Sequence, residues 1–168
     1  MPIILIIISF FLEGMITNLI SLDSLFLPLF TLTSMVILYP FFNREKFYNY
    51  IITCFIIGAI YDIAYTNSLF INTFSFSLIS VLIILIDHYI DSNIFSRSGI
   101  NIVSIVLYRI ITYFLLISFN YLSFNGNILI RGIYSSIIIN FIYGMFLYFI
   151  ANYINNKLIL KKKIKSKI

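Results

Sequence analysis

Long apolar runs separated by short polar breaks make up most of this chain. Stretches such as Ile3 to Phe11 and Val81 to Ile86 are apolar on every helical face, without the alternation of a half-buried strand. A helix that crosses the ~30 Å hydrocarbon core of a membrane needs about 20 residues. The pattern therefore predicts an all-α integral membrane protein.

Polar and turn residues divide the chain into separate predicted spans. A transmembrane domain over residues 1–156 and a basic tail over 157–168 are expected. Pro28 and Pro40 should make the second span irregular, because proline removes a helical hydrogen bond. The expected fold is a six-transmembrane-helix bundle, with spans at about 3–21, 25–42, 48–65, 69–90, 99–123 and 128–156.

The composition excludes most other classes of protein. The chain of 168 residues is 61% hydrophobic and 10% charged, with a mean hydropathy of +1.05. Soluble domains are usually about 25% charged, so an ordinary soluble enzyme or a disordered regulator is excluded. The N-terminus lacks the basic region of a cleaved signal peptide, and we expect it to be a retained first span.

The basic residues predict the orientation in the membrane. The tail holds the lysines at 157, 161, 162, 163, 165 and 167, and basic loops stay in the cytoplasm. An even number of crossings then places both termini on the cytoplasmic side of the membrane, together with the loops of Arg44 and Arg97. The tail is expected to contact membrane lipid. No basic stripe with interleaved aromatic residues exists elsewhere, so no nucleic-acid partner is expected.

Four charged residues fall within the predicted spans, where a charge costs a few kcal/mol unless it is paired or faces a cavity. Glu13 and Arg109 each lie ten residues into a span, near the midplane. Asp62 and Arg131 both lie near the outer surface. These depths allow the ion pairs Glu13–Arg109 and Asp62–Arg131. Either the pairs only neutralise each other, or one of them lines a cavity or contacts a partner's helix.

Small and polar residues recur every four positions along three of the spans. At this spacing they let helix backbones approach closely and exchange hydrogen bonds. The stripes serve either internal packing or the docking of a partner helix. They consist of Ser9, Glu13, Thr17 and Ser21 in the first span, Cys54, Gly58 and Asp62 in the third, and Gly132, Ser136, Asn140 and Gly144 in the sixth.

The chemistry expected of an enzyme is scarce. A metal site at Asp87, His88 and Asp91 is conceivable, but a solvated helix end is the expected interpretation. No catalytic triad, phosphate-binding loop or zinc motif occurs, and Glu13 and Asp62 lie at different depths. We predict no catalytic residue, no cofactor and no metal. An intramembrane enzyme would have to use the groups of Glu13, Asp62, Cys54 or Tyr108.

One segment of the third span carries a family resemblance. Gly58 and Asp62 form a Gly-x-x-x-Asp pattern, and Leu69 follows after a short polar turn. This pattern resembles the rod shape-determining protein family MreD, in which a glycine usually stands at the position of Phe70. Glu13, in Leu-Glu-Gly, is similar to an acidic residue in the first helix of that family. The segment from Arg131 to Asn140 is similar to the family's last helix.

The resemblance implies a noncatalytic component of the bacterial cell-elongation machinery, the elongasome, which controls cell shape and lateral peptidoglycan synthesis. Its implied partners are an MreC-like bitopic protein, a RodA-type glycosyltransferase with a class B penicillin-binding protein and, indirectly, an MreB-type filament. The family's architecture also resembles the substrate-binding subunits of energy-coupling-factor vitamin transporters. A solute-binding transporter subunit is therefore the alternative. In the scaffold interpretation, partners are expected to bind the helix-six stripe and the Gly58 face.

Overall fold

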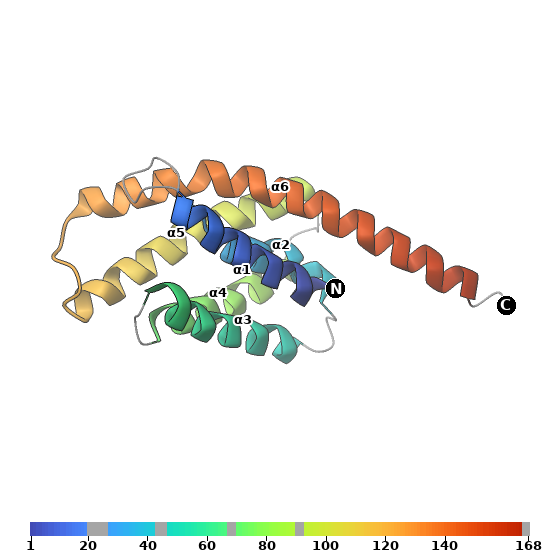
Figure 1. Cartoon of the computed structure of the whole chain (residues 1–168), viewed down its shortest axis with the longest axis horizontal. Coiled ribbons are helices and arrows are strands. Elements are labelled where there is room, and N and C mark those ends of the chain that lie inside the picture. The colour runs from blue at the N-terminus through green and yellow to red at the C-terminus, as the bar shows by residue number, and fades with distance from the viewer. Residues whose placement is uncertain (20–26, 43–46, 67–69, 90–92, 166–168) are drawn as a thin grey trace.

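The computed structural model is a bundle of helices (Figure 1). It describes residues 1–19, 27–42, 47–66, 70–89 and 93–165, and this part contains six α-helices and no strand. The predicted all-α fold is confirmed. The α-helices are α1 (Pro2–Leu19), α2 (Phe30–Leu38), α3 (Phe47–Tyr61), α4 (Ile71–Asp87), α5 (Ile94–Ser118) and α6 (Gly126–Lys165). A 3-10 turn, η1 (Tyr39–Phe41), follows α2, and a π-helical turn, η3 (Asp62–Thr66), follows α3.

Helix α2 is the centre of the bundle. All of its residues are buried, and it contacts α1, α4, α5 and α6. Its side chains are mostly apolar, as expected of a helix in the interior of a protein, and its polar side chains Thr31, Thr33 and Ser34 are buried as well. The packing of α2 therefore positions four of the other helices around it.

Two prolines explain why α2 is short. Pro28 lies just before the helix, and Pro40 lies in the 3-10 turn that follows it. The predicted span 25–42 thus forms a helix only from Phe30. Helix α4 is also apolar but short, whereas four helices are long and apolar enough to cross a membrane. These are Pro2–Leu19, Phe47–Thr66, Ile94–Ser118 and Gly126–Leu158.

The connection between α4 and α5 differs from the sequence prediction. Residues 94–98 were expected in a loop, but they form the first turns of α5. Arg97 is fully buried there and forms an ion pair with Asp87 at the end of α4. The solvated helix end predicted for Asp87 is therefore wrong, because a pair with Arg97 buries its carboxylate. His88 is exposed, and Asp91 lies outside the described residues.

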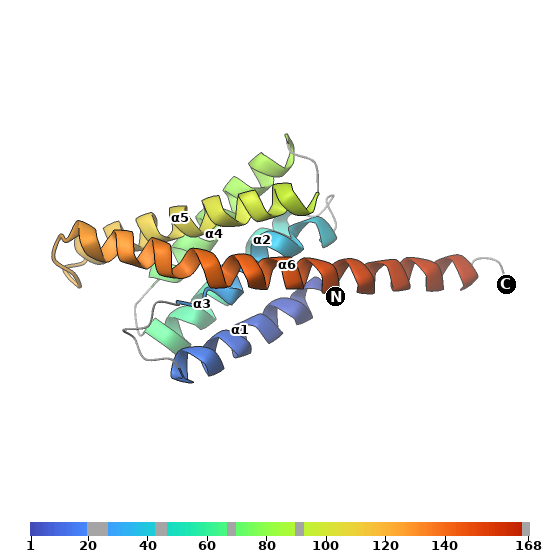
Figure 2. The ribbon, with the colours of Figure 1, turned by 90° about the horizontal axis from the view of Figure 1, so that it is seen from above.

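Helix α6 runs past the rest of the bundle (Figures 1 and 2). Ala151 is fully buried, and the described side chains that follow it are partly or fully exposed. The predicted end of the last span at 156 does not coincide with the end of this helix, which continues to Lys165. In Figure 1 the chain's N-terminus, the start of α5 and the C-terminal end of α6 lie toward one end of the bundle, and the turn between α5 and α6 lies at the other.

Candidate functional site

The carboxylate of Glu13 holds the first turn of α2. Glu13 is 2% exposed, and its Oε2 accepts hydrogen bonds from the backbone N–H of Thr31 (2.8 Å) and from the Thr31 hydroxyl (2.6 Å). Its Oε1 accepts a hydrogen bond from the hydroxyl of Tyr61 on α3 (2.7 Å). A helix N-terminus carries unsatisfied N–H groups and a partial positive charge. Glu13 therefore caps α2 from a neighbouring helix.

Asn140 of α6 satisfies the backbone just before α2. Its Oδ1 accepts a hydrogen bond from the N–H of Leu29 (2.8 Å), and its Nδ2 donates to the carbonyl of Leu27 (3.2 Å). The N–H of Leu27 donates to the backbone carbonyl of Ser135 (3.0 Å). Irregular backbone inside a membrane protein is tolerated where neighbouring groups satisfy it in this way. The segment around Pro28 is thus fixed to α6.

Asp62 makes an equivalent cap at the start of α4. It is 4% exposed; its Oδ1 accepts hydrogen bonds from the backbone N–H and the Nδ2 of Asn72, both at 2.9 Å. Its Oδ2 accepts from the N–H (2.9 Å) and the hydroxyl (2.7 Å) of Thr73. The Asn72 Oδ1 in turn accepts a hydrogen bond from the Tyr108 hydroxyl on α5 (2.6 Å). Asp62 therefore connects α3 with α4, and through Asn72 with α5.

The two predicted ion pairs do not form. Glu13 and Asp62 use their oxygens to cap α2 and α4, and neither contacts the arginine predicted for it within the described part of the chain. The physical reason is that a short helix inside the bundle presents bare N–H groups, which are themselves good partners for a carboxylate.

Arg109 is bound by a neutral partner. Its Nε (3.0 Å) and one terminal nitrogen (2.6 Å) donate to the hydroxyl oxygen of Ser136 on α6. Ser136 is fully buried and itself donates to the carbonyl of Gly132 (2.8 Å). Arg131 is exposed and lies one turn before Ser135 on the same helix. Both arginines border a cavity between α5 and α6.

Most of the described residues in the small-residue stripes face the interior of the bundle, whereas Thr17 is exposed. A Cβ added to Gly58 would lie 2.7 Å from the Thr73 Cα, so this glycine allows α3 to pack on the first turn of α4. At Gly144 a Cβ would lie 3.2 Å from the Asn101 Nδ2 and from the Thr33 Cγ2. These faces are covered by the protein's own helices. Of the two expected roles, internal packing is therefore the one that these contacts favour, and partner binding at these faces stays a prediction.

The other residues of the predicted stripes have the following places. Ser9 is fully buried and shares a hydrogen bond with the Tyr143 hydroxyl (2.6 Å). Cys54 is buried in the core, and the Thr17 hydroxyl donates to the carbonyl of Glu13. Ser21 lies outside the described residues. Gly132 borders the cavity beside Arg109.

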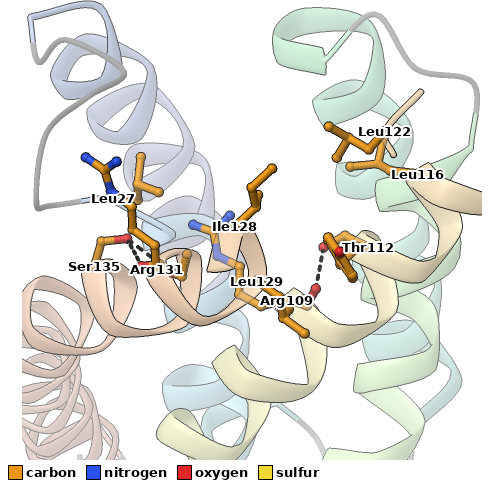
Figure 3. A pocket seen from close by; sticks show the side chains of 11 residues that line it. Leu27, Arg109, Thr112, Leu116, Leu122, Ile128, Leu129, Arg131 and Ser135 are labelled. Atoms are coloured by element: carbon orange, nitrogen blue, oxygen red, sulfur yellow. Dashed lines mark hydrogen bonds between the residues drawn. The ribbon is translucent and has the colours of Figure 1, made fainter. Parts of the chain in front are cut away.

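A cavity of about 360 Å³ opens between the second half of α5 and the first half of α6. Figure 3 shows Arg109 and Thr112 of α5 on one side, and Arg131 and Ser135 of α6 on the other. The hydroxyls of Thr112 and Ser135 donate to backbone carbonyls of their own helices. The wall is completed by the apolar residues Leu27, Leu116, Leu122, Ile128 and Leu129 and by Tyr113 and Gly132.

A second cavity, of about 310 Å³, shares Leu27, Arg109, Thr112 and Leu116 with the first. It continues past the start of α2 toward Asn72, at the cap of α4. No group of three histidine, cysteine or acidic residues that could hold a metal occurs among the residues that the structure describes. The polar groups that line the two cavities include the guanidinium of Arg109, the hydroxyl of Thr112 and the amide of Asn72, so this region offers hydrogen-bonding groups and positive charge.

Sequence reasoning identified the carboxylates but missed their partners. Thr31, Asn72 and Thr73 looked like ordinary hydroxyl and amide residues of apolar spans. One signal was available, because Asn72 and Thr73 directly follow the turn after Asp62, which is where a capped helix begins. The partners of Glu13 are 18 and 48 residues away along the chain.

The fold and these contacts define an α-helical membrane protein whose buried carboxylates brace the starts of α2 and α4. A family model described as rod shape-determining protein MreD matches residues 1–158. The chain belongs to this family, as its sequence predicts, and the family has a role in determining the rod shape of the cell. Searches of curated proteins and of solved structures find no match.

Proposed function

We propose that this protein is a noncatalytic scaffold of the rod-shape complex, which binds the transmembrane segments of partner proteins. The observation that carries the proposal is where the polar groups lie. Three buried polar groups bind the starts of α2 and α4 inside the bundle. They are the carboxylates of Glu13 and Asp62 and the amide of Asn140. What the bundle offers to other membrane proteins is its apolar outer surface.

Helix α6 offers the longest such surface. Six of its apolar side chains are each between 59% and 71% exposed, and they follow one another at steps of three or four residues along one side of the helix. This spacing marks a single helical face. We call this face the α6 stripe; it consists of Tyr134, Ile138, Ile142, Phe146, Phe149 and Tyr153.

We propose that the α6 stripe binds the single transmembrane helix of an MreC-like bitopic protein. The family acts in the rod-shape complex with MreC, and the apolar part of α6 extends over 33 residues, longer than one crossing requires. The far end of the stripe lies where α6 leaves the bundle, so a partner helix can pack there without competition from α1 to α5. Through this contact the protein would join a RodA-type glycosyltransferase, a class B penicillin-binding protein and, indirectly, an MreB-type filament.

The test compares two phenylalanines of nearly equal exposure. Phe146 on α6 is 62% exposed and Phe11 on α1 is 63% exposed. Phe146→Ala is expected to reduce co-purification of the MreC-like protein from native membranes about tenfold, as for a hot spot of an interface. Phe11→Ala should leave it unchanged. Equal losses, or no loss in either variant, would contradict the assignment of α6 as the binding face.

We further propose that both termini lie in the cytoplasm. The helix directions place the N-terminus and the lysine-rich end of α6 toward the same end of the bundle (Figure 1). A membrane-impermeant maleimide added to intact spheroplasts should label a cysteine introduced at Asn125 and should not label one introduced at Lys157. Labelling at 157 and protection at 125 would reverse the orientation.

The alternative function, a solute-binding transporter subunit, is favoured by one observation, the pair of connected cavities. Such a subunit should bind a vitamin tightly when purified alone. Equilibrium dialysis against a vitamin panel distinguishes the two functions, since the scaffold is expected to bind none.

A further inference from the structure

Arg109 is a charge inside the bundle that no carboxylate contacts in the described part of the chain. Its Nε and one terminal nitrogen donate to the hydroxyl oxygen of Ser136, which is neutral, so other N–H groups of the guanidinium still need acceptors. Glu13, the nearby acid, is held by Thr31 and Tyr61 instead. A positive charge within a membrane is costly and usually marks a site of function.

The cavity beside Arg109 has a polar and an apolar part. Arg109 and Arg131 lie on the two helices that form its sides, and no acidic residue is among the described residues that line it. The remaining wall consists largely of leucine and isoleucine side chains near the turn between α5 and α6 (Figure 3). Arg109 therefore brings a positive charge to the cavity from α5, and the wall toward the turn is apolar.

We propose that this cavity binds a phosphate ester, with Arg109 and Arg131 as its anion-binding residues. Guanidinium groups present N–H donors in a planar fork that matches the oxygens of phosphate. The volume of about 360 Å³ admits a phosphate headgroup together with the first carbons of an attached chain. The carbons of that chain would contact the apolar wall formed by Leu116, Leu122 and Ile128.

Phosphate esters reach such a site from two sources, the headgroups of membrane lipids and soluble phosphate esters. The lipid source is tested by native mass spectrometry of the purified full-length protein, supplied with dioleoylphosphatidylglycerol or with dioleoylglycerol. The two lipids have the same acyl chains, and only the first carries phosphate. The soluble source is tested by thermal unfolding in detergent with sn-glycerol 3-phosphate.

The variants separate binding from folding. Arg131→Gln alters an exposed side chain, and Arg109→Lys keeps the charge but loses the fork. Lys157→Gln, on the same helix but far from the cavity, is the matched control. Retention of phosphatidylglycerol is expected to fall about tenfold in Arg131→Gln and in Arg109→Lys and to remain unchanged in the control, because hydrogen bonds to charged groups are the strong ones.

Two outcomes support the site, and each identifies the source of its ligand. Arginine-dependent retention of phosphatidylglycerol over dioleoylglycerol assigns a lipid headgroup, and arginine-dependent stabilisation by glycerol 3-phosphate alone assigns a soluble ester. Equal retention of both lipids without stabilisation by the soluble ester would overturn the proposal. Unchanged binding in both arginine variants would overturn it as well. None of these outcomes depends on the α6 stripe, so the scaffold proposal stands or falls separately.

Discussion

Asp62 and Glu13 hold the starts of two short helices, but they reach those helices by different routes. Asp62 bonds residues that are 10 and 11 positions further along the chain, across the turn between α3 and α4. Glu13 bonds Thr31, 18 positions away, and Tyr61, 48 positions away. One cap is local, whereas the other requires three helices to be assembled first.

The difference also appears in how much support each helix start receives. At α4, Asp62 accepts hydrogen bonds from the backbone N–H groups of Asn72 and Thr73. It also accepts hydrogen bonds from the side chains of these two residues. At α2, Glu13 bonds one backbone N–H group, while Asn140 satisfies the preceding segment. Among the residues that the structure describes, a single carboxylate thus holds the start of α4. The start of α2 depends on two side chains from opposite ends of the chain.

Asp62→Ala is expected to give the largest loss of stability. It leaves several buried donors of Asn72 and Thr73 without an acceptor, and the free energy of unfolding should fall by about 3 kcal/mol. Denaturation in mixed micelles, followed by circular dichroism, measures the loss. Asp62→Asn, which keeps one acceptor oxygen, is the milder control. A loss below about 1 kcal/mol in Asp62→Ala would show that the local cap is dispensable.

Gly58→Ala should be the next most damaging change. Its Cβ would meet backbone atoms of Asn72 and Thr73, which cannot move without displacing the start of α4. A loss of about 2 kcal/mol in the free energy of unfolding is expected from overpacking. Gly144→Ala is the matched control near α2, because its closest neighbours are side chains at 3.2 Å, which can shift. If Gly144→Ala proved the more damaging of the two, the contrast between the regions would be reversed.

Glu13→Ala is expected to cost less than Asp62→Ala, about 1.5 kcal/mol, since it removes fewer hydrogen bonds and Asn140 still holds Leu29. The same denaturation measurement applies. Glu13→Gln retains an acceptor for Thr31 and serves as its control. Equal losses for Glu13→Ala and Asp62→Ala would contradict the view that the start of α2 has two supporting side chains and the start of α4 has one.

The smallest effect is a coupling between Glu13 and Asn140. Both side chains fix the start of α2, so the double variant with alanine at both positions should deviate from additivity by about 0.5 to 1 kcal/mol. Asp62 and Asn140 brace different helices, and their double variant should be additive. Double-mutant cycles of unfolding free energy measure both terms, and additivity at Glu13 and Asn140 would show that they act independently.

The sequence predicted the membrane class, the all-α fold and the family because each depends on pattern alone. Long apolar runs identify helices whatever surrounds them, and the spacing of Gly58 and Asp62 lies within one helix. The tertiary partners could not be predicted in the same way. The depth of each residue along its span predicted arginine partners for Glu13 and Asp62. This estimate left out the unsatisfied backbone N–H groups at the starts of α2 and α4, which bind the two carboxylates instead.

Arg97 is a second residue whose partner the sequence did not predict. A charged residue next to polar ones was interpreted as part of a loop, but its ion pair with Asp87 buries it completely within α5. Neither residue alone predicts this, because a solvated arginine and a buried one have the same sequence pattern. The helix ends shift accordingly, and α5 begins at Ile94 instead of near 99.

Beyond Ala151, α6 extends outside the helix bundle. The helix runs on to Lys165, and at 1.5 Å per residue this is about 20 Å of rod. Its lysines are thereby carried away from the other helices along a stiff arm. The tip of this arm therefore stands apart from the other helices, while its base stays packed against α2.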